Sequence, residues 1–263
     1  MSELVARAID VDAANFALGN EQFECEGAVF LRNRGWPSIY DANHVSRVTA
    51  SSPDEIDRLL SRMEQEYAGS RHRRFDVDHR TPPEFVARLA LDGYQRDDAL
   101  VLLLEGDLQG AAREYDIRPV ESDAAWSAYD ALHQIDWREH HQRTQLPEPP
   151  GVREQMLQAN RAKQPPVQNF FAYTDDRPVA YFNSWAGVGG MGQVENLFTH
   201  PDYRHQGAAT ALIHDCVADC RRKGVGPIVI VTDPADTPKN MYAAMGFRPV
   251  ALVSHFLKKL PVE

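Results

Sequence analysis

The chain has 263 residues, enough for one large domain or two small ones, and a hydrophobic content of 43% that is ample for a core. Its formal net charge of −10 and pI of about 5.5 argue against a general nucleic-acid binder, which needs a basic face to displace counterions. No stretch approaches the roughly 20 apolar residues of a membrane span, and no basic segment followed by an apolar run opens the chain, so we expect a cytoplasmic protein without a signal peptide.

The first half of the chain predicts a small α/β unit. Residues 23–32 are predicted to form a strand. Ser52, followed by proline and then by Glu55, has the pattern of a helix start with a capping box. The apolar face of this helix continues at helical spacing through five residues, Ile56, Leu59, Leu60, Met63 and Tyr67. A helix over residues 83–91 and a buried strand over residues 99–104 follow.

A seam between residues 106 and 117 divides the chain into two expected domains, residues 1–115 and 116–263. The second domain predicts ten elements in this order: a strand at 117–120, a helix from Ser122 to about 134, a helix at 153–163, strands at 169–174, 179–185 and 193–199, a helix ending before Gly224, a strand at 227–232, a short helix ending at Gly246 and a strand at 247–258. The order β-α-α-β-β-β-α-β-α-β indicates a mixed, mostly antiparallel sheet flanked by helices.

The loop after the strand at 193–199 has the properties of a phosphate site. A loop that turns directly into a helix leaves several backbone N–H groups unpaired. Arg204 and His205 add cationic side chains beside them, and Gly207 has no side chain where a phosphate must approach the backbone. Ala208 and Ala209 are small for the same reason.

This segment resembles the GNAT superfamily of acyl-CoA-dependent N-acyltransferases. Arg204-x-x-Gly207-x-Ala209 matches the superfamily's Gln/Arg-x-x-Gly-x-Gly/Ala loop for the CoA pyrophosphate. Residues 240–247, Asn-Met-Tyr-Ala-Ala-Met-Gly-Phe, look like its Tyr-x-x-x-Gly-Phe ending. The resemblance covers about residues 117–259 and implies a GNAT-type α/β (α+β) fold that uses acetyl-CoA as co-substrate without a metal.

The resemblance also implies which residues bind the co-substrate. The family has a splayed strand that pairs with the pantetheine arm, followed by the pyrophosphate loop, and an asparagine near the final tyrosine that contacts CoA. The corresponding residues are Leu197, Phe198, Thr199, Arg204, His205, Gln206, Gly207, Ala208, Ala209, Thr210 and Asn240. Asn240 is the least direct match, because the family asparagine usually lies about two turns before the tyrosine.

Two residues are expected to carry the chemistry. Tyr242 falls where GNAT enzymes commonly hold a tyrosine that stabilises or protonates the leaving thiolate. Glu195 is expected to share a strand face with Gln193 and Leu197, where a carboxylate can take a proton from an ammonium group directly or through water. A packed tyrosine and a structural glutamate are the alternatives, and Gln193 lies where some family members have the base.

The first half echoes part of the same fold. Residues 83–91, Gly93-Tyr94 and residues 99–104 follow the pattern of the helix, Gly-Phe and final strand of the second half. It has no Arg/Gln-x-x-Gly-x-Gly loop. We therefore expect a degenerate GNAT-like domain that binds no second acetyl-CoA but helps to wall the acceptor pocket, with an unrelated α/β cap as the alternative.

Three further patterns favour structural roles. Residues 187–192 contain G-x-G-x-x-G, but a strand follows instead of a helix, which indicates a hairpin rather than a dinucleotide site. The histidine-rich segment 133–141 is expected to be a loop near the acceptor pocket, without the ligand geometry of a metal site. Cys216 and Cys220, four residues apart on one helix face, are expected to be core thiols, as no further zinc ligands stand at suitable spacing.

These patterns predict an acetyl-CoA-dependent N-acetyltransferase that acts on a primary amine. The alternative is a non-catalytic module that binds acyl-CoA as a sensor or serves as an interaction platform. A monomer or homodimer with no nucleic-acid or membrane partner is expected. The sequence leaves the acceptor open among small amines, aminoglycoside-like antibiotics, amino acids and protein N-termini.

Overall fold

The computed structural model describes residues 3–260. Its elements in chain order are α1 (Glu3–Ala17), β1 (Glu21–Cys25), β2 (Ala28–Arg32), β3 (His44–Ser46), α2 (Pro53–Glu66), β4 (His72–Val77), α3 (Pro83–Leu91), β5 (Gln95–Leu104), β6 (Asp116–Pro119), α4 (Asp123–Thr144), α5 (Val152–Ala162), β7 (Val167–Thr174), β8 (Arg177–Trp185), β9 (Gly192–Thr199), the 3₁₀ turn Pro201–Tyr203, α6 (Ala208–Arg222), β10 (Ile228–Thr232), α7 (Pro238–Ala244) and β11 (Arg248–Lys259).

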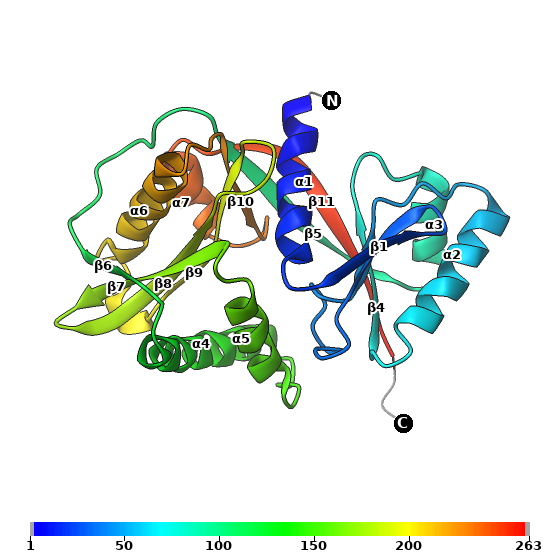
Figure 1. The fold of residues 1–263 in the computed structure, drawn as a ribbon, viewed down its shortest axis with the longest axis horizontal. Coiled ribbons are helices and arrows are strands. Elements are labelled where there is room, and N and C mark those ends of the chain that lie inside the picture. The colour runs from blue at the N-terminus through cyan, green and yellow to red at the C-terminus, as the bar shows by residue number, and fades with distance from the viewer. Residues whose placement is uncertain (1–2, 261–263) are drawn as a thin grey trace.

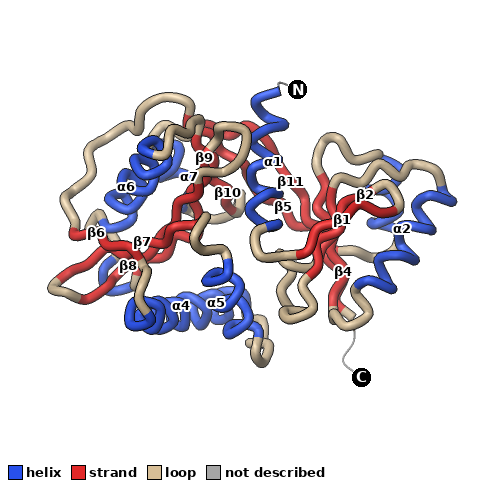
Figure 2. Tube along the Cα trace, in the orientation of Figure 1, coloured by secondary structure: helices blue, strands red, loops and turns tan. Residues whose placement is uncertain are grey.

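One sheet of 11 strands passes through both lobes of the molecule (Figure 1). The strands lie in the order β1-β2-β3-β4-β11-β5-β10-β9-β8-β7-β6, and Figure 2 shows the strands in red with helices on their outer sides. Neighbouring strands are antiparallel except for β3 with β4 and β9 with β10, which are parallel. The predicted mixed, mostly antiparallel α/β fold is thus confirmed.

The pairing pattern of the first lobe is repeated in the second. Strands β1 to β4 lie side by side with only the last pair parallel, and β7 to β10 do the same. In each half a short helix then ends before a glycine in the left-handed conformation, Gly93 (φ 81°) or Gly246 (φ 97°), and a long strand follows. The repetition favours two related halves, and the degenerate GNAT character of the first half stays a prediction.

The final strands of the two halves lie at the centre of the sheet and are exchanged. Leu104 of β5, in the first half, pairs with Ile228 of β10 in the second. Phe256 of β11, at the end of the second half, pairs with Phe75 of β4 in the first. Strands β5 and β11 also pair with each other, so the sheet has no break between the lobes (Figure 1). The expected domain boundary at residues 115/116 falls between β5 and β6 and stays a prediction.

Helices cover both faces of the second lobe's sheet. Helices α6 and α7 pack on one face, where Phe182, Ile213 and Cys216 belong to one buried cluster. Helix α4 packs on the other face through a cluster that includes Tyr129. Cys216 and Cys220 are both fully buried, which confirms them as core thiols, and burial raises the pKa of Cys220 to about 11.

Helix α1 lies between the two lobes, an element that sequence analysis did not identify (Figure 1). Its apolar side joins a buried cluster with side chains of β5, β10 and β11. The signal was present in the sequence, because Leu4, Ala8 and Val11 recur at helical spacing. This helix brings polar side chains of the first half, including Asp12 and Asn15, against the second half.

Two sequence-based boundaries were wrong. Residues 23–32 form a hairpin instead of one strand, because Glu26 (φ 48°) and Gly27 (φ 70°) adopt the left-handed conformation of a tight turn. Helix α4 continues to Thr144 instead of ending near residue 134, since no glycine or proline interrupts its pattern. The other predicted elements are confirmed to within a few residues, including the capping box of Ser52 with Glu55 and the hairpin over residues 187–192.

Candidate active site

Strands β9 and β10 separate at the centre of the second lobe. Their parallel pairing includes only Gly192 with Ile228 and Gln193 with Val229. Beyond these pairs β9 continues to Thr199 along β8, while β10 continues along β5. The backbone edge of β9 from Glu195 onward is therefore not bonded to β10 and faces an opening between the two strands.

A bulge in β9 sets which side chains face each side of this opening. Asn183 of β8 pairs with Glu195, and Tyr181 pairs with Phe198, so β9 has one extra residue, and Asn196 there has a φ of 63°. Glu195 and Phe198 consequently point to the face covered by α4 and α1.

Leu197 packs instead with the cluster beneath α6, which also contains Val194. The expectation that Glu195 and Leu197 share a face was therefore wrong, because the bulge breaks the strict alternation of a regular strand.

A cleft of about 820 Å³ extends from this opening to the start of α6. It brings together most of the residues expected to bind CoA, namely Leu197, Phe198, Thr199, Arg204, His205, Gly207, Ala208, Ala209 and Thr210. Gln206 does not line it, and its side chain donates to the backbone oxygen of Asp202. Asn240 is exposed one residue before Met241, which does line the cleft.

The N-terminus of α6 opens into this cleft. Gly207 is its N-cap, with a φ of 99° and no side-chain capping bond. The first N–H groups of a helix have no intrahelical partner, and the helix dipole favours an anion in front of them. Helix α2, at the matching place in the first lobe, has its terminus closed by the side chains of Ser52 and Glu55.

The C-terminal half of α4 is connected to both sides of the cleft. Glu139 accepts two hydrogen bonds from Arg204, at 2.7 and 2.5 Å, and Arg143 pairs with Asp236 at 3.1 Å. The bond from Arg204 holds the pKa of Glu139 below its ordinary value. These are half-exposed pairs that contribute modestly to stability, but they position α4 over the cleft.

Residues 126–247 match the Acetyltransferase (GNAT) family. These residues form a GNAT domain. No curated protein matched the chain.

Solved structures show the same fold over nearly the whole chain. A functionally unknown conserved protein from Staphylococcus epidermidis has a TM-score of 0.69 at 15% identity, covering 93% of this chain and 96% of its own. A GCN5-related N-acetyltransferase from Kribbella flavida has a TM-score of 0.69 at 17% identity, covering 98% and 96%. A tandem GNAT protein from the clavulanic acid biosynthesis pathway has a TM-score of 0.60 at 12% identity, covering 90% and 79%. The last likeness supports a two-domain arrangement.

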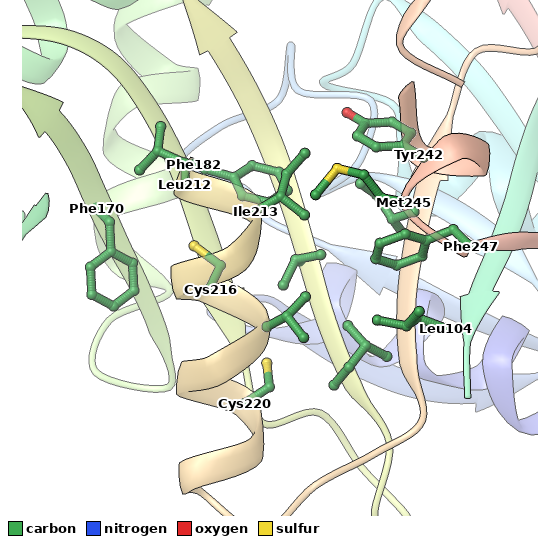
Figure 3. Packing of buried hydrophobic residues seen from close by; sticks show 14 of the residues in the cluster. Leu104, Phe170, Phe182, Leu212, Ile213, Cys216, Cys220, Tyr242, Met245 and Phe247 are labelled. Carbon is green, nitrogen blue, oxygen red and sulfur yellow. The ribbon is translucent and has the colours of Figure 1, made fainter. Parts of the chain in front are cut away.

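Tyr242 of the GNAT domain is buried on α7, on the α6 side of the sheet. Its ring packs near Phe247, with centroids 6.2 Å apart, and its hydroxyl points away from Met245 and Phe247 (Figure 3). Burial raises the pKa of this phenol above its ordinary value, with a smaller contribution from Asp236. The phenol therefore keeps its proton at neutral pH.

Glu195 lies on the opposite face of the GNAT sheet, where the two lobes meet. Its carboxylate is 3.9 Å from the ammonium of Lys163 and 3.4 Å from the amide nitrogen of Gln193. Burial raises the pKa of Glu195, and Asp41 adds to this shift while Lys163 opposes it. A carboxylate with a raised pKa is a stronger base than one in water.

Sequence reasoning missed a row of buried polar side chains beside Glu195. Asn169, Asn183 and Glu195 are adjacent on β7, β8 and β9 and face the same side. Both asparagines are 2% exposed, and Asn169 Nδ2 and Asn183 Oδ1 have no hydrogen-bond partner within residues 3–260. Polar residues inside otherwise apolar strands were the available signal.

The histidine-rich segment was wrongly expected to be a loop, because His133, His140 and His141 lie on helix α4. His140 lines the cleft, while His133 is buried, and that burial lowers its pKa to about 4. Among the described residues no group of three or more His, Cys, Asp or Glu is gathered as a metal site. None of the helices within residues 3–260 is long and apolar enough to span a membrane.

Proposed function

We propose that the protein transfers the acetyl group of acetyl-CoA to a primary amine by direct attack on the thioester. One observation carries this proposal: a buried carboxyl group with a raised pKa, Glu195, lies on β9 just beyond the last pairing of β9 with β10, and a buried phenol, Tyr242, lies on the α6 side of the same sheet. A non-catalytic acyl-CoA sensor would require the cleft but neither of these groups.

The cleft accounts for the binding of the co-substrate. The open N-terminus of α6 at Gly207 suits the pyrophosphate, with Arg204 and His205 as nearby cations. The unpaired edge of β9 from Glu195 to Thr199 offers backbone donors and acceptors to the amides of the pantetheine arm. Since the matching terminus of α2 is occupied by its own capping box, we expect one CoA per chain.

The reaction divides between the two faces of the sheet. Glu195 takes a proton from the acceptor ammonium, and the free amine forms a bond to the thioester carbonyl carbon. The carbon–sulfur bond breaks, and Tyr242 donates its proton to the departing thiolate. The nitrogen loses its second proton as the amide forms, and this proton returns to Tyr242 through solvent. Gln193 is an unsuitable base because its amide nitrogen donates to the neighbouring carboxyl groups.

The first lobe contributes to the acceptor side of this site. Helix α1 brings Asp12 and Asn15 close to Glu195, and Trp36 donates to Gln158 of α5. These contacts support the expectation that the first half walls the acceptor pocket. A cytoplasmic location and a monomeric or homodimeric state stay predictions.

The test is release of free CoA from acetyl-CoA in the presence of a panel of primary amines. We expect release with at least one amine, and a loss of about 10²–10⁴-fold in kcat/KM in Glu195→Gln, which keeps the size of the side chain but cannot accept the proton. Glu24→Gln, on the exposed strand β1, is the matched control and should retain wild-type activity. CoA binding without acetyl transfer to any amine would favour the sensor.

A further inference from the structure

A carboxyl group of the first half lies beside the candidate base. Asp12 of α1 is 6% exposed, and its Oδ1 accepts a hydrogen bond of 2.8 Å from Gln193 Nε2. The same nitrogen is 3.4 Å from Glu195 Oε2. One amide thus connects two buried carboxyl groups that come from different halves of the chain.

The carboxyl group of Glu195 affects the titration of Asp12. Burial raises the pKa of Asp12 to about 7, and the charge of Glu195 adds to the shift. Two carboxyl groups that interact lose their protons in two steps, and the pKa of each step is a property of the pair rather than of one residue. The pair therefore takes up a proton near neutral pH more readily than an isolated carboxylate.

Other charged groups face this pair from every neighbouring element. Lys163, after α5, approaches Glu195 and is 2.5 Å from Asn15 Oδ1, while Asp41, in the segment before β3, raises the pKa of Glu195. On the first-lobe side, His255 lowers and Asp76 raises the pKa of Asp12. A small cavity of about 30 Å³ adjoins Asp12 there, large enough for a water molecule, and its charged or titratable lining residues are Asp12, His44, Arg47, Asp76, Asp78 and Arg80.

We propose that Asp12 is a positioning residue of the acceptor site, which acts through Gln193 and Glu195 to favour acceptors that arrive as ammonium ions. The inference rests on the proposed function. When both carboxyl groups are ionised, the single ammonium of Lys163 leaves one of their two charges uncompensated, which favours a cationic acceptor. The substrate class is an alkyl primary amine, which is charged in water, rather than a neutral aromatic amine.

Asp12 acts through its charge and its hydrogen bond. When both carboxyl groups are ionised, their repulsion favours uptake of one proton by the pair, so the pair accepts the proton of the ammonium more readily than Glu195 would alone. Gln193 orients both carboxyl groups through the one amide nitrogen. The overall reaction converts acetyl-CoA and an alkylammonium into the N-acetylamine, free CoA and one proton, which Glu195 releases to solvent.

Asp12→Asn isolates the charge, because an asparagine oxygen can still accept the bond from Gln193. In the full-length protein we expect the acid limb of the kcat/KM–pH profile, measured with an alkylamine, to move about one pH unit lower. Asp12→Glu should restore the limb towards its wild-type position. Asp10→Asn is the matched control on the same helix, because Asp10 pairs with Arg47 and Arg80, and it should leave the limb unchanged.

A second measurement does not depend on activity. Carboxyl-carbon NMR titration of Asp12 and Glu195 should show a step near pH 7 in the wild-type protein that is lost in Asp12→Asn and kept in Asp10→Asn. An active enzyme whose acid limb and Glu195 titration are the same in Asp12→Asn would overturn the inference and leave the proposed function intact. A wild-type protein that binds CoA but acetylates no amine would overturn the proposed function, and the role of Asp12 with it.

Discussion

The roles proposed for Tyr242 and Glu195 are chemically opposite, and burial favours both of them. Removal from water disfavours the charged form of either group, so the phenol retains its proton and the carboxylate becomes more basic. An exposed tyrosine or glutamate would have neither property to the same degree. The effect depends on the side chains packed around each group rather than on the identity of the residue alone.

Removing the hydroxyl of Tyr242 should affect chemistry more than binding. We expect Tyr242→Phe to lower kcat by about 10²–10⁴-fold while CoA affinity, measured by calorimetry, stays nearly unchanged. The ring packs in the same cluster in either case, so the fold should persist. Tyr173→Phe, a half-buried tyrosine on β7, is the control. A wild-type rate in Tyr242→Phe, where chemistry is limiting, would assign Tyr242 a structural role.

The stability of the protein should fall as the pH rises towards 8. The pKa of Asp12 is about 7 in the folded protein and near the ordinary value of 3.8 when unfolded. Between these values the folded state binds more protons than the unfolded state, so raising the pH favours unfolding. We expect the melting temperature to decrease between pH 5 and pH 8, and to decrease less in Asp12→Asn.

Asp76 serves as the comparison for Asp12, because its pKa is shifted in the opposite direction. Burial alone would raise the pKa of Asp76, but Arg74 and its other neighbours hold it well below its ordinary value. Its stabilising effect is therefore complete above about pH 4 and adds no slope between pH 5 and 8. An equal slope in wild-type protein and Asp12→Asn would contradict the assignment to Asp12.

Individual residues of the site differed in how well the sequence predicted them. The phosphate loop was identifiable because Arg204, Gly207 and Ala209 lie within six positions and need no tertiary information. The face of Leu197 was mispredicted because a bulge leaves no simple mark in the sequence. Asp12 and Lys163 were missed because they reach Glu195 only through the packing of α1 and α5.

At the scale of elements, the loop between β9 and α6 has the strictest requirement for a glycine, at position 207. Gly207 adopts a φ of 99°, which L side chains rarely take, and it precedes the open turn of α6. A side chain there would be strained and would also stand where an anion is expected.

We expect Gly207→Glu to abolish measurable CoA binding by calorimetry without unfolding the protein. Gly93→Glu is a matched control, because Gly93 also has a positive φ (81°) and nothing lies within 4 Å of its added Cβ. Both variants have the backbone strain, of about 1–2 kcal/mol, but only Gly207→Glu adds a carboxylate at the phosphate site. Unchanged CoA affinity in Gly207→Glu would remove the phosphate assignment of the loop.

Helices and strands with strong local signals were predicted well. The helices that start at Ser52 and Ser122 have serine N-caps, and both caps are present. The hairpin of β1 and β2 was read as one strand, because its turn depends on the positive φ of Glu26 as well as on a glycine. The exchange of β5 and β11 could not be predicted, because either strand would satisfy the apolar pattern of either lobe.

At the scale of the molecule, the exchange makes each half incomplete alone. Strand β5 fills the space between β10 and β11, and α1 covers buried apolar residues such as Val101, Val229 and Val253. Without the first 115 residues, β10 would have one unpaired edge, β11 would lose both of its neighbouring strands, and an apolar face would be exposed.

A fragment of residues 116–263 should therefore be insoluble or inactive on the native acceptor. The matched comparison cuts the chain in the exposed loop near residue 110 and supplies residues 1–110 and 111–263 together, which should restore soluble activity since every strand is present. Size-exclusion chromatography and CoA release measure the two properties. Full activity from a soluble 116–263 fragment would show that the first half has no part in the acceptor site.

The exchanged strands also bear on how the chain is made. During synthesis β5 leaves the ribosome well before its partners β10 and β11, and its last four residues, 101–104, are all apolar. The first half cannot complete its own sheet either, because the strand that pairs with β4 on this side is β11 of the second half. Folding at the centre of the sheet is thus postponed until β11 has been synthesised, and over that interval the apolar strand β5 is exposed to aggregation.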